Sequence, residues 1–494
     1  MIKNFKWLLL VSLTFAACNN DDDKDSPVVA VPVTAGSADF SNYVALGNSL
    51  TAGYMDGALY IKGQENSWTK ILSDQFKLAG GGDFRIPYMN DNYGGLLLGG
   101  NRITDNRLFF NGAGPERLSV VDYPPTNEIG VPLSGPFNNM GVPGAKSFHL
   151  LASGYGNVAG VPSGAANPYF ARFASSATAT ILGDALSQNP TFFSLWIGNN
   201  DILSYATSGG IGVNQTGNLN PATYGSNDIT DPTVFAGAYS MIVDQLTQTG
   251  AKGVVANLPY VSTIPYFTTV PYNPLPLDAA KAGALNSGYA GYNGGLAVAQ
   301  GAGLISADEK ARRTVTFAEG KNAVVIVDSY LTNLSALGLP SYRMATAEDL
   351  LVLPSSTFIG TVVGGNPSAV NGASVPLADN WVLSKDEVVE VRTATDAYNA
   401  TIAAVASSKG LAFVNANQLM SDLADGGITS NNFTLTSALV FGTAFSLDGV
   451  HPTARGYALI ANVFSKAINE TYGSTLPMVD ISKYNPMFPK VITD

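Results

Sequence analysis

Histidine and cysteine are almost absent from this chain, which has two histidines and one cysteine in 494 residues. The only cysteine, Cys18, cannot form a disulfide bond within the chain. So few side chains cannot supply the usual ligand sets of a zinc hydrolase, and we expect no metal or organic cofactor. Imidazole, with an unperturbed pKa of about 6.5, is the most frequent base near neutral pH. Base chemistry would therefore depend on His149 or His451.

Charged residues are also scarce, since Asp, Glu, Lys and Arg make up 13% of the chain. The formal net charge of −11 disfavours a nucleic-acid partner, because such binding needs basic patches. Apolar residues make up 46%, with 52 Gly and 27 Pro, which indicates a globular, loop-rich protein. Beyond the N-terminus, no run reaches the roughly 18 apolar residues of a membrane helix.

The N-terminal segment has the pattern of an export signal. Lys3 and Lys6 precede an apolar run, residues 7–17, that is too short to span a bilayer. The run ends in Phe-Ala-Ala-Cys, which resembles a bacterial lipobox. We therefore predict that residues 1–17 are a lipoprotein signal peptide and that Cys18 carries the lipid that attaches the protein to a membrane. The alternative is an ordinary secretory signal that ends near a cysteine.

Residues 18–38 are first polar and acidic and then rich in Pro, Ala and Val, as expected of a lipidated tether. The acidic run after Cys18 is similar to a surface-export signal of some Gram-negative lipoproteins, and it is equally a solvated spacer. The predicted location is the cell envelope, at the outer membrane, with exposure at the cell surface if the acidic run is an export signal. Residues 39–480 are predicted to form one hydrolase domain, and residues 481–494 a C-terminal tail.

The body of the chain alternates predicted strands with predicted helices. Apolar, β-branched or aromatic runs at 43–47, 191–197, 253–258 and 411–416 are predicted strands. Predicted helices cover 234–250, 384–410 and 454–470, and Ser384 with Glu387 forms a capping box at the start of the second. This alternation predicts an α/β fold with a parallel sheet covered on both faces.

Functional side chains gather at the carboxyl ends of the strands in such sheets. Ser49 follows the first strand, Gly144 lies in a glycine-rich turn, and Asn200 follows the strand at 191–197. Near the C-terminus, Asp448 precedes His451 by three residues, so its carboxylate can reach one ring nitrogen. Together these residues could supply a nucleophile, a base, an orienting carboxylate and donors to an oxyanion.

Four segments in this order, GNSLTAGY, NMGVPGA, IGNND and DGVHP, resemble blocks I, II, III and V of the SGNH (GDSL-type) hydrolases. The resemblance implies a three-layer sandwich with a five-stranded parallel sheet of flavodoxin-like type. It implies that Ser49 is the nucleophile and that Asp448 and His451 activate it. The amides of Ser49 and Gly144 and the side chain of Asn200 would form the oxyanion hole.

The resemblance covers residues 40–262 and 384–472, and it has one departure. Block I usually has Asp before the serine, whereas this chain has Asn48, which keeps a hydrogen-bonding side chain but loses the charge. Two stretches, 56–137 and 263–383, match no motif. We expect these insertions to lie near the strand ends and to determine substrate specificity.

Other interpretations fit less well. The chain has no Gly-x-Ser-x-Gly, which disfavours an α/β-hydrolase nucleophile elbow. Ser49 could instead cap a helix and His451 could pack in a core, while His149, between Phe148 and Leu150, is predicted to be structural. A lipid-anchored glycan- or lipid-binding protein without turnover is favoured by Asn48, but the presence of all the other site residues opposes it. The sequence therefore predicts an exported, lipid-anchored serine esterase or lipase-like hydrolase of carboxylic esters, acting on an acylated glycan or a lipid.

Overall fold

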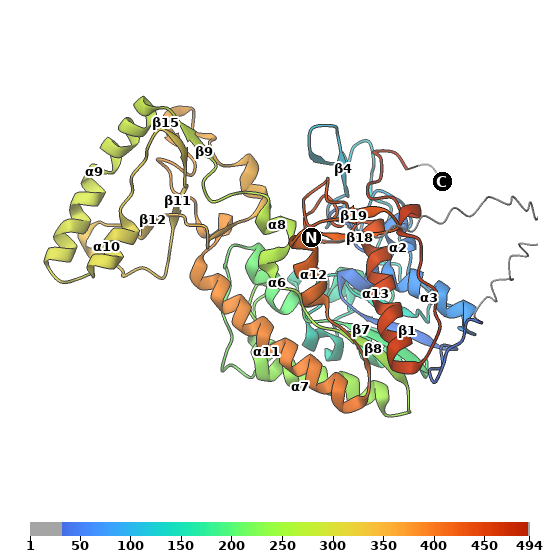
Figure 1. Cartoon of the computed structure of the whole chain (residues 1–494). Coiled ribbons are helices and arrows are strands. Elements are labelled where there is room, and N and C mark those ends of the chain that lie inside the picture. Colours follow the sequence, from blue (N-terminus) through green and yellow to red (C-terminus); the bar gives the residue numbers. More distant parts are fainter. Residues whose placement is uncertain (1–31, 493–494) are drawn as a thin grey trace, which may run out of the picture. The chain divides into compact units, whose positions relative to one another are not determined.

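The structure is a computed structural model that describes residues 32–492 (Figure 1). The predicted signal peptide, Cys18 and most of the predicted tether lie outside the described residues. A folded unit begins at Val33 and continues to the end of the described chain.

A five-stranded sheet forms the centre of this unit, with the strand order β17-β8-β7-β1-β6. Every neighbouring pair is parallel, which confirms the predicted α/β fold class. The strands are β1 (Tyr43–Gly47), β6 (Asn139–Gly141), β7 (Phe192–Trp196), β8 (Lys252–Ala256) and β17 (Ala412–Val414). The four predicted strands are all present, and the turn predicted around Gly144 follows the fifth, β6.

Helices cover both faces of the sheet and complete three layers (Figure 1). The helices α7 (Pro232–Thr247) and α11 (Lys385–Lys409) pack against each other on one face, and α3 (Trp68–Leu78) and α13 (Ala454–Tyr472) do so on the other. The predicted capping box is present at Ser384, and Gly410 ends α11 in the left-handed conformation, with φ of 61°.

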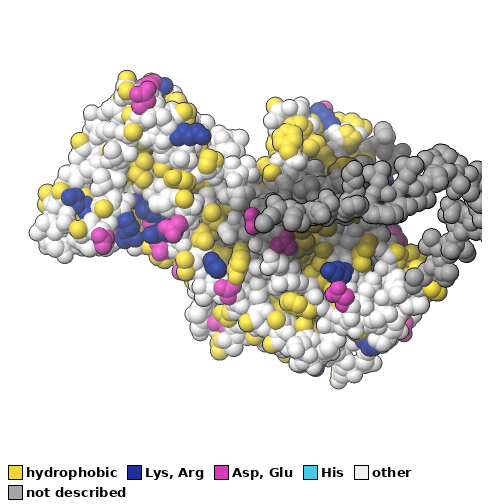
Figure 2. All heavy atoms as spheres, in the orientation of Figure 1, with side chains coloured by type: hydrophobic (Ala, Val, Ile, Leu, Met, Phe, Trp, Pro, Cys, Tyr) yellow, Lys and Arg dark blue, Asp and Glu magenta, His cyan; other side chains and the backbone are white. Residues whose placement is uncertain are grey.

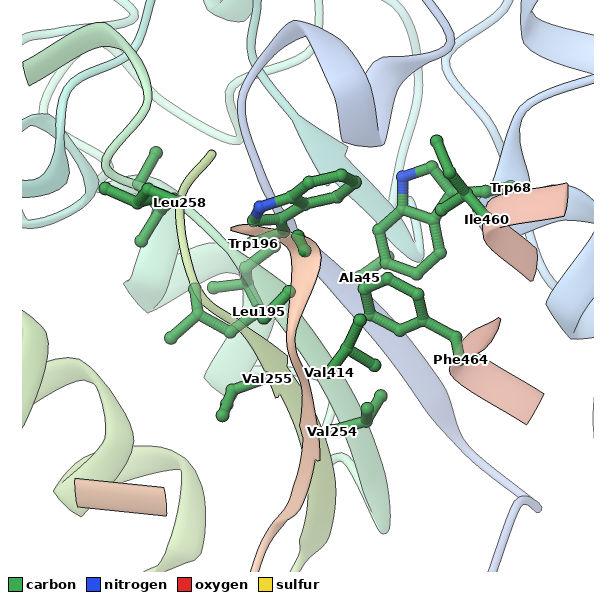
Figure 3. Close-up of a cluster of buried hydrophobic side chains, with 14 of the residues drawn as sticks. Ala45, Trp68, Leu195, Trp196, Val254, Val255, Leu258, Val414, Ile460 and Phe464 are labelled. Carbon is green, nitrogen blue, oxygen red and sulfur yellow. The ribbon is translucent and has the colours of Figure 1, made fainter. Parts of the chain in front are cut away.

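Large aromatic side chains fill the core next to the end of β7 (Figure 3). The rings of Trp68 and Phe464 have centroids 4.2 Å apart, and Trp68 meets Trp196 edge-on at 6.1 Å. Burying each such ring stabilises the fold by about 1.5–3 kcal/mol. Trp196 is the last residue of β7, so this packing holds the end of that strand in place. Asn200 follows shortly after this strand end.

The stretch 56–137 is only partly an insertion, because α3, one of the layer helices, belongs to it. The stretch predicted as an insertion therefore contains one helix of the layers that cover the sheet. Its α3 has apolar residues at helical spacing that pack against α13. Its other elements are α2 (Ile61–Glu65), β2 (Leu97–Leu98), β3 (Asn101–Arg102), β4 (Leu108–Phe110) and β5 (Pro115–Arg117).

The stretch 263–383 is an insertion between β8 and α11, and it has a hydrophobic core of its own. Its Arg343 is buried and pairs with Asp328 and Asp349, and Asp349 also accepts a hydrogen bond of 2.9 Å from the N–H of Lys385 at the start of α11. Its helices are α8 (Pro265–Thr268), α9 (Ala279–Gly301) and α10 (Ala307–Arg313). Its strands form antiparallel pairs: β9 (Leu275–Leu277) with β10 (Gly320–Asn322), β11 (Val325–Val327) with β12 (Tyr342–Met344), β13 (Leu350–Leu351) with β16 (Val382–Leu383), and β14 (Val362–Val363) with β15 (Asn366–Val370).

Short elements complete the framework around the strand ends. The turn after β1 and the segment after β7 form α1 (Ser49–Ala52) and α6 (Asn200–Thr207). The remaining elements are α4 (Pro168–Ala171), α5 (Ile181–Leu186), α12 (Ala416–Ala424), β18 (Ile428–Ser430) and β19 (Phe433–Leu435).

Both ends of the described chain form hydrogen bonds with the body of the fold. The N–H of Ser37 donates to the carbonyl of Tyr472 at 2.8 Å, and Thr34 and Thr475 bond through their backbones at 3.0 Å. In the predicted tail, the carbonyl of Pro489 accepts a hydrogen bond of 2.7 Å from Arg107. Residues of the predicted tether and of the predicted tail therefore form hydrogen bonds with the body of the fold.

Charged side chains of both signs are scattered and intermixed on the face shown in Figure 2. No helix within residues 32–492 is long and apolar enough to cross a membrane.

Candidate active site

Ser49 lies where β1 ends, as the first residue of α1. The preceding Asn48 is buried, and its Oδ1 accepts the N–H of Leu50 at 3.0 Å. Its Nδ2 donates to Asn199 Oδ1 at 2.9 Å. The residue that departs from the family pattern therefore uses both ends of its carboxamide to hold the turn that presents Ser49.

Ser49, His451 and Asp448 form one hydrogen-bonded chain. His451 Nε2 lies 2.8 Å from Ser49 Oγ, and His451 Nδ1 lies 2.9 Å from Asp448 Oδ2. A carboxylate only accepts hydrogen bonds, so Nδ1 carries the proton and Nε2 is free to accept the serine hydroxyl. The fold thus brings together three predicted site residues from opposite ends of the chain, in an arrangement that can remove a proton from Ser49.

The Asp448 carboxylate is held in its ionised form. Its Oδ1 accepts the N–H groups of Val450 and His451 at 2.9 and 2.8 Å, and its Oδ2 accepts the N–H of Gly57 at 2.8 Å. Burial alone would raise the pKa of this carboxyl, but the charge of His451 and these hydrogen bonds outweigh burial and lower the pKa to about 2. Asp448 can therefore orient His451 and stabilise its positive form at any ordinary working pH.

Gly144 lies in the turn after β6, where its φ of +84° favours glycine. The turn is fixed on both sides: Val142 donates to the carbonyl of Gly47 at 3.0 Å, and Asn200 Nδ2 donates to the carbonyl of Ala145 at 2.9 Å. Among residues 32–492, the backbone N–H groups of Ser49 and Gly144 donate to no protein acceptor. These amides, and the second N–H of the Asn200 side chain, are available to a ligand at the strand ends.

Asp56, which no sequence motif marks, supports the loop that carries Asp448. Its carboxylate accepts the N–H of Leu447 at 3.1 Å and the hydroxyl of Tyr60 at 2.8 Å, while its own N–H donates to Ser446 Oγ at 2.9 Å. With the Gly57 contact, the first turn of the 56–137 stretch binds residues 446–448. The Asp-Gly pair signals a turn in the sequence, but its partner almost 400 residues later has no such signal.

Asp56 leads to a prediction about stability and pH. Burial, as the main cause, raises the pKa of Asp56 from 3.8 to about 6 in the folded protein. Wild type should therefore lose stability as the pH rises from about 4 through 6, because the folded state must give up a proton that the unfolded state has already lost. Asp56→Asn cannot ionise, so its unfolding free energy relative to wild type should increase over this range by at most about 3 kcal/mol. Denaturant unfolding at pH 4 and pH 7.5 measures this, and an unchanged difference between the two proteins would contradict it.

Tyr54 restricts the position of His451. Its ring centroid lies 4.6 Å from that of the imidazole, with an interplanar angle of 45°. The hydroxyl of Tyr54 donates to the carbonyl of Gly57 at 2.7 Å, and Tyr457 donates to the carbonyl of Tyr54 at 2.7 Å. The imidazole therefore packs against a side chain that is itself held in place.

His149 is absent from this arrangement. Its Nδ1 accepts the N–H of Lys146 at 3.0 Å, and its ring stacks on Tyr155 at 4.3 Å. Burial, helped by the charge of Lys146, lowers the pKa of His149 to about 3, so the ring is neutral near pH 7. These contacts fit the structural role predicted for it. Within the described part of the chain, no cluster of three His, Cys, Asp or Glu side chains is placed to hold a metal ion.

No family model and no curated protein matches this chain. Two solved structures resemble it weakly. LAE5, an alpha/beta hydrolase enzyme from the metagenome of Lake Arreo in Spain, has 10% identity and a TM-score of 0.31 over 87% of this chain and 96% of its own. An extracellular lipase from Streptomyces rimosus has 13% identity and a TM-score of 0.26 over 86% of this chain and 99% of its own. At these values neither structure informs the activity of this chain.

Proposed function

We propose that the protein is a serine-dependent hydrolase of carboxylic esters, of the SGNH type. The observation that carries this proposal is the chain of hydrogen bonds from Ser49 through His451 to Asp448, with distances of 2.8 and 2.9 Å. The order of the four sequence segments and the five-stranded parallel sheet support the family assignment.

In the proposed reaction, Ser49 Oγ attacks the ester carbonyl carbon while His451 Nε2 takes its proton. The carbonyl oxygen becomes negative in the tetrahedral intermediate, and the amides of Ser49 and Gly144 with the side chain of Asn200 stabilise it. When the intermediate collapses, His451 gives its proton to the leaving alcohol. Water, deprotonated by His451, then attacks the acyl-enzyme, and the acid leaves with Ser49 restored.

A fluorophosphonate probe tests the proposal, because it reacts covalently with activated serines. Labelling at Ser49, found by peptide mass spectrometry, together with hydrolysis of p-nitrophenyl esters, would support a hydrolase. The competing proposal is a glycan- or lipid-binding protein on the same fold. Protein that binds such a ligand but neither reacts with the probe nor hydrolyses any ester would favour it.

We also propose that the protein is exported and anchored to the cell envelope by lipid on Cys18. The support is the sequence pattern of residues 1–18. Since the folded unit begins at Val33, the tether is about 15 residues and can extend to roughly 50 Å. Such a reach suits a substrate at or near a membrane surface, either a lipid or an acylated glycan. The acidic run remains a proposed surface-export signal.

Cys18→Ser should convert a membrane-fraction protein into a soluble exported one. Several acyl chains together hold a protein on a membrane far more firmly than one chain, and this substitution removes their attachment site. Specific activity on small esters should be unchanged. The measurement is the share of protein in washed membranes, with Ser26→Ala, also in the tether, as the matched control. Substituted protein that stays in the membrane fraction after a high-salt wash would show that lipid is not the anchor.

A further inference from the structure

A cavity opens directly beside Ser49 and His451 at the carboxyl ends of the strands. We propose that it binds the acyl chain of a fatty-acyl ester, an inference that rests on the proposed function and specifies its substrate class. The cavity volume is about 90 Å³, which is small for a ligand pocket and therefore admits a narrow group in preference to a bulky one.

The walls of this acyl cavity are predominantly apolar. They come from the end of β7, the loop after β8, the helix α12 and the first turns of α13. Trp196 and Ile460 belong also to the buried cluster drawn in Figure 3, so the inner wall continues into the core. Side chains that form the wall include Trp196, Val261, Leu419, Met420, Leu423 and Ile460.

Away from the site residues Ser49, Asn200 and His451, polar side chains in the wall are bonded to protein partners. Asn48 and Asn199 bond to each other, and Trp196 Nε1 donates to the carbonyl of Asn257 at 3.1 Å. A sugar in the cavity would bury hydroxyl groups without such partners, and each unpaired buried hydroxyl is costly. An aliphatic chain has no polar groups to satisfy and gains free energy from burial. The cavity therefore favours a fatty-acyl chain over a glycan.

The order of steps in the proposed reaction indicates that the cavity binds the acyl group of the ester and not the alcohol. The leaving alcohol must depart past His451, and water must then reach the same place to attack the acyl-enzyme. An apolar cavity that held the alcohol would hinder both events. The acyl group, in contrast, stays on Ser49 until deacylation, and an enclosed cavity can hold it throughout.

The position of the cavity changes which residues we expect to determine substrate specificity. The stretches 56–137 and 263–383 were expected to determine it. Of the residues that line the cavity, only Ile264 comes from either stretch. The rest belong to the framework and to the segments after β8 and β17, because the carboxyl ends of β7, β8 and β17 already surround the space next to Ser49.

The first test compares kcat/KM for p-nitrophenyl octanoate with kcat/KM for p-nitrophenyl acetate. Both esters are used at concentrations at which they do not form micelles. Each buried methylene favours the longer chain by about fourfold at most, so partial burial should give octanoate a kcat/KM on the order of 10²-fold above acetate. A difference under threefold, in protein whose Ser49 reacts with a fluorophosphonate probe, would overturn the acyl-chain proposal. Protein that neither reacts with the probe nor hydrolyses either ester would instead overturn the proposed function.

The second test reduces the volume of the cavity by placing a larger side chain in its wall. Ala416 is buried and lines it at the start of α12, whereas Ala424, at the end of the same helix, is exposed. Ala416→Phe should reduce the octanoate-to-acetate ratio by on the order of 10-fold or more, while Ala424→Phe should leave it unchanged. Leu419→Trp provides a second filling variant if Ala416→Phe does not fold. A ratio unaffected by a folded filling variant would overturn the assignment of the chain to this cavity.

A third comparison separates the two sides of the ester. Octyl acetate places the long chain on the alcohol, and its kcat/KM should exceed that of ethyl acetate by less than about threefold. If octyl acetate instead gains as much as octanoate does, and Ala416→Phe removes that gain, the cavity binds the alcohol and the acyl assignment is wrong.

Discussion

Ser49→Ala is expected to lower kcat for ester hydrolysis by on the order of 10⁴–10⁶-fold. Without Oγ there is no nucleophile for His451 to activate, although the donors of the oxyanion hole remain. The fold should persist, because Ser49 occupies the first position of α1, where the cap comes from the Asn48 side chain and not from the serine hydroxyl. Stopped assays on p-nitrophenyl butyrate, with circular dichroism for the fold, measure both effects.

Fluorophosphonate labelling provides a second measurement of the same variant. Ser49→Ala should not be labelled at all, and Ser176→Ala, which changes an exposed serine, should react as wild type does. A Ser49→Ala protein that still reacts would place the nucleophile at another residue.

His451→Ala should be nearly as damaging as Ser49→Ala, because the two residues act as a unit. The serine hydroxyl would lose its acceptor at 2.8 Å, and the leaving alcohol would lose its proton donor. Labelling of Ser49 by the probe should fall in parallel. In the double variant Ser49→Ala/His451→Ala, the loss should be no greater than in either single variant. If kcat of the double variant fell by the product of the two single losses, Ser49 and His451 would not act as a unit.

His149→Ala is the matched control, since it removes the other histidine of the chain. It should reduce kcat/KM by less than about tenfold, and it should lower the free energy of unfolding by about 1–3 kcal/mol, because the N–H of Lys146 loses its partner. An inactive but stable His149→Ala, next to an active His451→Ala, would transfer the role of base to His149.

The elements that position Ser49 could be predicted because their signals are local. The strand at 43–47 is a short apolar run, and the capping box of α11 lies within four residues of sequence. The fold class could be predicted because such strands alternate along the chain with predicted helices. Asp56 and Tyr54 could not be predicted in the same way, because their roles consist of contacts with residues 446–457, which are near only in the folded chain.

The helix α3 within the 56–137 stretch could not be predicted as part of the framework for a related reason. A family motif marks only the loops that carry chemistry, so α3 has no motif although it packs against α13 as part of the framework. The hydrogen bonds of Asn48 likewise could not be predicted. Its loss of charge is visible in the sequence, but its partner Asn199 belongs to a different strand end.

The separation of Ser49 from His451, 402 residues along the chain, has a consequence for the order of synthesis. At about 5–20 residues per second, roughly 20–80 s pass between translation of the proposed nucleophile and translation of the proposed base. During that time the nascent chain has a serine at the end of β1 but neither the loop at 446–451 nor α13 to complete the site. The proposed hydrolysis is thereby confined to chains that extend past this loop, and a product cut short before residue 451 would carry the proposed nucleophile without the proposed base.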